Sequence, residues 1–402
     1  MTVLYLAPLL PSPSGSGGKR AVFNHVLSLA SNSEGETFKF LFINVEEEDW
    51  VKPKELDNLN IAVYPRAMPR AKNGMRSVIS GILQAIFGLL PRAAAVVSSD
   101  KLSKELGGRI AKGDVSLIVV DHLTIAPVAV EHAGSIPIVY IAHNIETNII
   151  DQQLEYEPSA AKKIFLYIQY WKMRRLETRV LGLSSKIICI APADANNTFI
   201  SKYSKKVAVW PELPEEKAKQ WSFSGNKRLL FVGSASYFPN FDAIRWLCEN
   251  LMPKVGVVDS SIILHFVGTS LEQVKGRLKI PNNVVFEGFV SSDELETMHL
   301  KADLFICPVT LGSGVKIKLL EAASYGLPIA ADVRSLEGIE FLDGNCIEFD
   351  RENTQNNVDQ LANNLISKLA NQGKLEFYSS QVRRALSGQR RTRKMLAAEL
   401  KI

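Results

Sequence analysis

The sequence predicts an α/β protein with two domains, each built on a parallel β-sheet. Three observations favour this fold class. The length of 402 residues exceeds that of one typical domain. Apolar, strand-like runs alternate with helical ones along the whole chain, as in parallel α/β proteins. The alternation starts a second series after residue 205, so we expect a domain at 1–205 and another at 206–384.

The expected strands are short apolar runs bounded by turn residues. In the first domain they are 3–7, 39–45, 116–120, 138–142 and 186–190. In the second domain they are 228–233, 262–268, 284–286, 303–309, 328–331 and 346–349. Residues 210–226 are expected to link the domains, and a last helix at about 385–402 is expected to pack back on the first domain. Each half is then a Rossmann-like domain facing the other across a cleft, with ligands at the carboxyl ends of the strands.

Composition indicates a globular protein in a reducing compartment. Hydrophobic residues make up 46% of the chain, and the net charge of +5 is too small to indicate nucleic acid as a partner. The four cysteines form no CxxC pair, and three lie in strand-like runs, so we expect buried thiols and a cytoplasmic protein. Residues 1–18 are interpreted as a first strand and loop, not as a signal peptide.

Two segments raise the question of a membrane. The longest apolar stretch, 78–90, is interrupted by polar residues and glycines and is shorter than a membrane span. It is either a helix lying on a membrane surface or a core helix with basic flanks. The basic stretch 382–402 is either a solvated helix face or a contact with an anionic membrane surface. A peripheral position at the inner face of the membrane is therefore one expected location.

The most informative segment is 312–328, GSGVKIKLLEAASYGLP, which follows the expected strand 303–309. A glycine loop that opens a helix presents unpaired N–H groups and a partial positive charge, which suits a phosphate. Lys316 and Lys318 add positive charge, and Glu321 suits the hydroxyls of a ribose or a sugar because it accepts hydrogen bonds. The other interpretation is a loop–helix pair with an exposed ion pair between Lys318 and Glu321.

A second glycine loop, 14–18, follows the first strand. Gly15 and Gly17 begin a G-x-G-x-x-G pattern, but Arg20 stands where the third glycine belongs. An NAD site is therefore poorly supported. A looser phosphate- or sugar-contacting loop, with the backbone open at Gly17 and Gly18, remains an interpretation.

The fourth expected strand ends in His143-Asn144-Ile145-Glu146, which places polar side chains at a carboxyl strand end. His143 is either a functional residue or a structural one with its hydrogen bonds satisfied, and His122, after Asp121, has a weaker case. No zinc-protease, serine-hydrolase or complete P-loop motif occurs. The sequence also has no D-x-D pair to hold a metal–diphosphate, so we expect no metal and no cofactor.

Together these motifs resemble the group 1 (family 4) glycosyltransferases of the GT-B fold. The resemblance rests on Pro11 with Gly17-Gly18, His143-Asn144-Ile145-Glu146, Phe231-Val232-Gly233, Gly288-Phe289-Val290 and, above all, the segment 312–328. The run Tyr237-Phe238-Pro239-Asn240 and the GSG form of the loop resemble a branch associated with bacterial exopolysaccharide synthesis.

The resemblance implies a retaining, metal-independent hexosyltransferase. It would move a sugar from a nucleoside diphosphate sugar to a hydroxyl of a glycan or a lipid-linked saccharide. The donor would bind mainly to the second domain and the acceptor to the first. Glu321 matches the family's second glutamate, expected at the ribose, while Ser313 stands in place of the first. Ser234 and Asn240 stand roughly where the family tends to place Arg and Lys.

We expect His143 and Lys316 to act in catalysis, His143 beside the donor sugar and Lys316 at the leaving diphosphate. The expected donor-binding residues are Gly17, Gly18, Gly233, Ser234, Gly312, Ser313, Gly314, Lys318 and Glu321. Two other functions stay open. One is a nucleotide-sugar 2-epimerase, which shares the two-domain architecture. The other is a non-catalytic, sugar-nucleotide-binding scaffold protein in polysaccharide assembly, which the substitutions at the family's charged positions favour.

Overall fold

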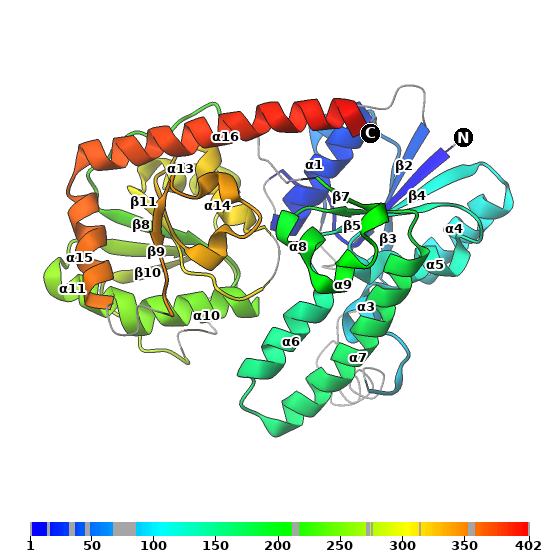
Figure 1. The fold of residues 1–402 in the computed structure, drawn as a ribbon, viewed down its shortest axis with the longest axis horizontal. Coiled ribbons are helices and arrows are strands. Elements are labelled where there is room, and N and C mark those ends of the chain that lie inside the picture. The colour runs from blue at the N-terminus through cyan, green and yellow to red at the C-terminus, as the bar shows by residue number, and fades with distance from the viewer. Residues whose placement is uncertain are drawn as a thin grey trace. The chain divides into compact units, whose positions relative to one another are not determined.

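The computed structural model confirms two α/β units, each with its own parallel sheet (Figure 1). It describes residues 2–13, 17–31, 37–44, 49–66, 86–210, 217–270, 274, 276–312, 315–352 and 358–400. Residues 1–211 form the body of one unit, and residues 212–399 form the other.

Within the described part of the first unit, seven parallel strands are ordered β3-β2-β1-β4-β5-β6-β7. Their bounds are β1 Thr2–Ala7, β2 Thr37–Asn44, β3 Ile61–Pro65, β4 Val115–Asp121, β5 Ile138–Ala142, β6 Lys186–Cys189 and β7 Val207–Val209. The five expected strands are present. The edge strands β3 and β7 were not expected, and β7 extends the first sheet beyond residue 205.

The helices of the first unit cover both faces of its sheet. They are α1 Gly17–Ser31, α3 Arg92–Val97, α4 Asp100–Ala111, α5 Ala126–His132, α6 Glu146–Tyr156, α7 Ala160–Leu183, α8 Pro192–Asn196 and α9 Thr198–Ser201. Alternate residues of β1 enter different cores: Val3 and Tyr5 pack in one with residues of α1, and Leu4 and Leu6 pack in the other with residues of α3, α4, α5 and α7. Burial on both faces explains why these strands read as continuous apolar runs.

The second unit repeats this strand order with six described strands, β10-β9-β8-β11-β12-β13, all parallel. Their bounds are β8 Arg228–Val232, β9 Ile263–Val267, β10 Val284–Gly288, β11 Leu304–Cys307, β12 Ile329–Asp332 and β13 Ile347–Phe349. All six were expected. In both sheets the order reverses beside the first strand, between β1 and β4 and between β8 and β11, which is where α/β sheets bind ligands.

The helices of the second unit are α10 Phe238–Trp246, α11 Met252–Val258, α13 Ser292–Lys301, α14 Ile317–Ser324, α15 Val358–Leu369 and α16 Gln372–Leu400. The basic C-terminal stretch is the later part of α16, the long red helix in Figure 1, which begins well before the expected residue 385. Arg383 on this helix donates to the Ser379 hydroxyl and to the carbonyl of Trp221, so the start of the stretch is anchored in the second unit.

Other expectations have mixed outcomes. All four cysteines are free and buried, as expected. No helix in the described ranges is long and apolar enough to cross a membrane. Most of the segment 78–90 lies outside the described residues, as do Ser313 and Gly314 of the glycine loop before α14 and residues 211–216 of the linker.

Candidate active site

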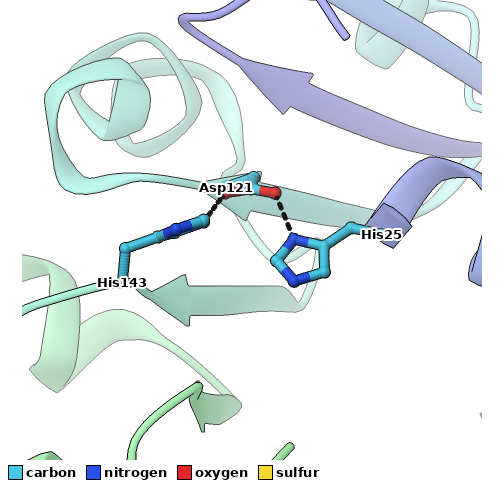
Figure 2. Close-up of side chains that lie close together, drawn as sticks. All are labelled: His25, Asp121 and His143. Carbon is cyan, nitrogen blue, oxygen red and sulfur yellow. Dashed lines mark hydrogen bonds and ion pairs between the residues drawn. The ribbon is translucent and has the colours of Figure 1, made fainter. Parts of the chain in front are cut away.

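In the first unit, polar side chains converge on Asp121 at the carboxyl end of β4. Asp121 is fully buried. The Tyr5 hydroxyl from β1 and a ring nitrogen of His143, which follows β5, contact its carboxylate. His25 Nδ1, from α1, and His122 Nδ1 each lie 2.8 Å from a carboxylate oxygen. Figure 2 shows His25 and His143 reaching Asp121 from different elements. We call these five residues the Asp121 cluster.

The cluster is organised around an ionised carboxylate. Burial alone would raise the pKa of Asp121, but His143 and His25 beside it and the hydrogen bonds from His122 and His143 hold that pKa well below its usual range. Burial, followed by the neighbouring His122, lowers the pKa of His143 to about 4. At neutral pH a neutral His143 therefore donates one ring N–H to the carboxylate, and its other nitrogen is an acceptor.

His122 has an unusual backbone and a close ring neighbour. Its φ of 77° with ψ of 140° lies in a region that non-glycine residues rarely adopt. Its ring stacks on His143 with 3.6 Å between the centroids. A Cβ built at Gly18 would lie 3.8 Å from His122 Nε2. The structure thus brings Gly18, His122 and His143 close together, although the sequence analysis considered them as separate candidates.

The segment from His143 to Glu146 is held by α7. The buried carboxylate of Glu177 accepts from the backbone N–H groups of Glu146, at 2.9 Å, and of Thr147, at 3.1 Å, and also from the Thr147 hydroxyl. These are N–H groups of the first turn of α6, which have no partner within the helix. A carboxylate there also matches the positive end of the helix dipole. The loop that carries His143 is therefore fixed by its neighbours.

The Asp121 cluster is also compact enough to hold a cation. His25, Asp121 and His143 each offer one ligand atom, and these atoms lie within 4.8 Å of one another. The carboxylate already accepts hydrogen bonds from four side chains, which fills its usual capacity without a metal. The need for a metal in the reaction is a separate question, and its absence stays a prediction.

In the second unit, the side chain of Lys318 reaches the carboxyl end of β8. Its ammonium group donates to Asn240 Oδ1 and lies 4.3 Å from the centroid of the Phe231 ring. A Cβ at Gly233 would lie 2.7 Å from Asn240 Nδ2 and 2.9 Å from Lys318 Nζ, so a side chain there would displace this pair. Asn240 also donates to the carbonyl of Ser234 at 2.9 Å, which fixes its amide. Asn240, one of the two residues that stand roughly where the resemblance places cationic residues, thus meets a cation from α14.

The charge of Lys318 is poorly compensated. Within the described ranges, its recorded partners are an amide oxygen and an aromatic face, and neither is a carboxylate. Burial, together with repulsion from Lys316, lowers the pKa of Lys318 to about 8. An ammonium group in this environment favours an anion.

Lys316 and Glu321 flank Lys318 along the chain. Lys316 is the N-cap residue of α14, and its buried ammonium donates to the carbonyl of Gly312 at 2.9 Å, on its own loop. Glu321 is buried on the same helix. Helix α14 ends as expected before Gly326, whose φ of 67° suits a glycine. The ion pair between Lys318 and Glu321, which was the alternative interpretation of this segment, is not among the recorded ion pairs of the described residues.

Two other expected donor-binding residues, Gly17 and Ser234, lie in different units. Gly17 begins α1, and Ser234 follows β8, where its hydroxyl bonds to those of Ser236 and Thr269. Sequence reasoning did not select the other members of the Asp121 cluster. A signal for two of them existed. Asp121 ends β4 and His122 follows it, and β4 lies between β1, which precedes the glycine turn, and β5, which precedes His143. That order becomes visible only once the sheet topology is known.

Comparison with known proteins agrees with this architecture. The family model described as glycosyl transferases, group 1, matches residues 226–371. HepE from Anabaena, solved in complex with UDP and glucose, is 13% identical with a TM-score of 0.65, over 100% of this chain and 99% of that chain. Sucrose-phosphate synthase from Thermosynechococcus elongatus is 11% identical with a TM-score of 0.62, over 99% of both chains. Among curated proteins, none matches this sequence.

The solved structures share the fold, and the family model covers most of the second unit, including the helix that carries Lys318 and Glu321. On these findings, the chain has the two-domain GT-B fold of the solved glycosyltransferases, and its second unit matches the group 1 glycosyl transferase model over residues 226–371.

Proposed function

We propose that this protein is a glycosyltransferase that moves a sugar, with retention of configuration and without a metal, from a nucleoside diphosphate sugar to a hydroxyl of a glycan or a lipid-linked saccharide. The observation that carries the proposal is the poorly compensated ammonium of Lys318, which is repelled by Lys316, whose own ammonium bonds to the carbonyl of Gly312. A diphosphate bound there would neutralise both lysines and would meet the N-terminus of α14. The positive charge of Lys316 and Lys318 therefore suits a bound diphosphate.

In this proposal, positive charge held in advance at the diphosphate is the main source of catalysis. Lys316 and Lys318 stabilise the negative charge that develops on the leaving diphosphate. Glu321 accepts hydrogen bonds from the ribose hydroxyls. His143 lies at the reacting sugar, where one ring nitrogen is held by Asp121. The leaving diphosphate takes the proton of the attacking hydroxyl, so the mechanism requires no separate base.

The solved complexes of HepE suggest which donor to test first. That protein was solved with UDP-glucose at 15% identity and a TM-score of 0.62, so a uridine nucleotide is our first choice. A role in bacterial exopolysaccharide synthesis, as a peripheral protein at the inner face of the membrane, is the finer proposal. Co-sedimentation with anionic vesicles at low salt supports the membrane contact, and a protein that stays in solution excludes it.

A thermal-shift screen against UDP, GDP, ADP and TDP and their sugar conjugates, with and without EDTA, tests the donor site. A ligand at a hundred times its Kd adds about 2.7 kcal/mol of stability, which gives a measurable shift. We expect one nucleotide to stabilise the protein regardless of EDTA, and the Lys318→Met variant to lose that shift. No response to any nucleotide would favour a scaffold protein. A donor isomerised in the absence of acceptor would favour an epimerase.

A further inference from the structure

The ring of His122 keeps one nitrogen open within the Asp121 cluster. Its Nδ1 is bonded to Asp121, and no hydrogen bond to Nε2 is recorded among the described residues. The side chain is only 16% exposed, so the open nitrogen belongs to a largely enclosed ring. Because the carboxylate of Asp121 takes the hydrogen on Nδ1, Nε2 of the neutral ring carries a lone pair. This nitrogen can accept a hydrogen bond from a ligand.

The backbone of His122 indicates that this placement has a function. A φ of 77° is costly for a side chain with a Cβ, and such strain persists only where the surroundings enforce it. Three recorded contacts hold His122 here: the bond to Asp121, the stack on His143, and a hydrogen bond of 3.3 Å from its backbone N–H to the carbonyl of Ile141. Strained residues of this kind gather at binding and catalytic sites.

The neighbourhood of Nε2 determines which ligand fits. The position of a Cβ at Gly18 lies 3.8 Å from it, in the first turn of α1, where the backbone N–H groups have no partner within the helix. An acceptor beside backbone donors suits a group that both donates and accepts, and a hydroxyl does both. A side chain at Gly18 would extend toward this nitrogen, and its Cβ would also lie 2.8 Å from Leu9 Cδ1.

We propose that His122 Nε2 accepts a hydrogen bond from a carbohydrate hydroxyl, and that Asp121 is the positioning residue that fixes the His122 tautomer. The inference rests on the proposed function and adds to it a second sugar-contacting histidine, beside His143. The hydroxyl belongs either to the sugar of the donor or to the saccharide acceptor, which share this chemistry.

Three variants test the contact. His122→Phe keeps a flat ring to stack on His143 but has no acceptor. His122→Asn keeps a side-chain acceptor and tolerates positive φ. His132→Asn is the matched control, because it removes a histidine of the same unit that bonds to Ser103, outside the cluster. We expect His122→Phe to lower kcat/KM by about fivefold to tenfold, the loss of one hydrogen bond. His122→Asn should lose less, and the control should resemble the wild type.

The kinetic readouts separate the two sources of the hydroxyl. If the donor sugar supplies it, His122→Phe slows the hydrolysis of the nucleotide sugar without acceptor. If the acceptor supplies it, that hydrolysis is unchanged and the KM for the acceptor rises. In both cases the affinity for the nucleoside diphosphate alone stays at the wild-type value. Unchanged hydrolysis, donor KM and acceptor KM in His122→Phe would overturn the proposal.

A second measurement does not depend on the proposed function. In ¹⁵N-histidine NMR spectra of the neutral ring, with the His122 signals identified from His122→Phe, we expect the hydrogen on Nδ1 and an unprotonated Nε2. Asp121→Asn, which introduces an N–H donor, should produce the other tautomer in part. Glucose, galactose or mannose at high concentration should shift the Nε2 signal. A protonated Nε2, or no shift with any sugar, overturns the inference even in a protein that binds no nucleotide.

Discussion

Replacing Lys318 with methionine should weaken donor binding and make it insensitive to alkaline pH. Methionine has a similar length and no charge. The pKa of Lys318, lowered from 10.5 to about 8, means that the enclosed charge costs about 3 kcal/mol in the ligand-free protein. A diphosphate that restores the ordinary pKa recovers up to that amount. We therefore expect the Kd for a nucleoside diphosphate sugar at pH 7 to rise about tenfold to a hundredfold in Lys318→Met.

The pH dependence gives a sharper test of the same reasoning. With a pKa of about 8, about nine in ten Lys318 side chains are charged at pH 7 and about one in ten at pH 9. The Kd of the wild type should then rise about tenfold over this range, while that of Lys318→Met stays nearly constant. The assay is calorimetric titration with a nucleotide sugar, because the charge of its diphosphate does not change between pH 7 and pH 9. Parallel curves for the two proteins would refute the reasoning.

The same pKa makes a prediction for stability. Because the pKa of Lys318 is lower in the folded protein, the unfolded chain binds more protons between about pH 8 and pH 10.5. This residue therefore adds stability as the pH rises through that window, and Lys318→Met should lack the increase. The ligand-free variant should also melt no lower than the wild type at pH 7, since a desolvated charge has been removed. A clearly lower Tm would indicate a structural role for Lys318.

Three other substitutions test neighbouring assignments. Glu321→Gln should raise the KM for the donor more than it lowers kcat, and the reverse pattern would contradict a role in ribose binding. Lys316→Met should lower kcat by about a hundredfold, through the lost charge and the lost bond to the carbonyl of Gly312, and an unchanged rate would remove Lys316 from the site. Gly326→Ala should destabilise the protein by more than about 1 kcal/mol, because φ is 67° and the new Cβ would lie 2.6 Å from Arg383 Nε. An unchanged midpoint in urea would contradict that reading.

The regular part of the fold could be predicted from the sequence because both sheets are buried on both faces. Buried parallel strands are continuous apolar runs, and eleven such runs correspond to observed strands. The two strands that were not expected, Ile61–Pro65 and Val207–Val209, are short and lie at the edges of the first sheet. Their residues are only partly buried or exposed, so the apolar signal is weak.

The site was only partly predictable, because its partners are distant in the sequence. The loop–helix pattern gave a candidate phosphate site at Lys316 and Lys318. It did not show that the Lys318 ammonium meets Asn240, which depends on β8 and β11 being neighbours. The Asp121 cluster depends in the same way on β1, β4 and β5 lying side by side. Local patterns therefore selected His143 but could not show that Tyr5, His25 and His122 meet it at Asp121.

The measurement that tests the central claim most directly is the release of nucleoside diphosphate from a panel of nucleotide sugars in the presence of EDTA. The wild type should turn over one donor slowly with water as the acceptor, and Lys318→Met should do so at least about tenfold more slowly. The His132→Asn control should match the wild type. If the wild type releases no nucleoside diphosphate from any donor, or if Lys318→Met is as fast as the wild type, the diphosphate site proposed at Lys316 and Lys318 is wrong.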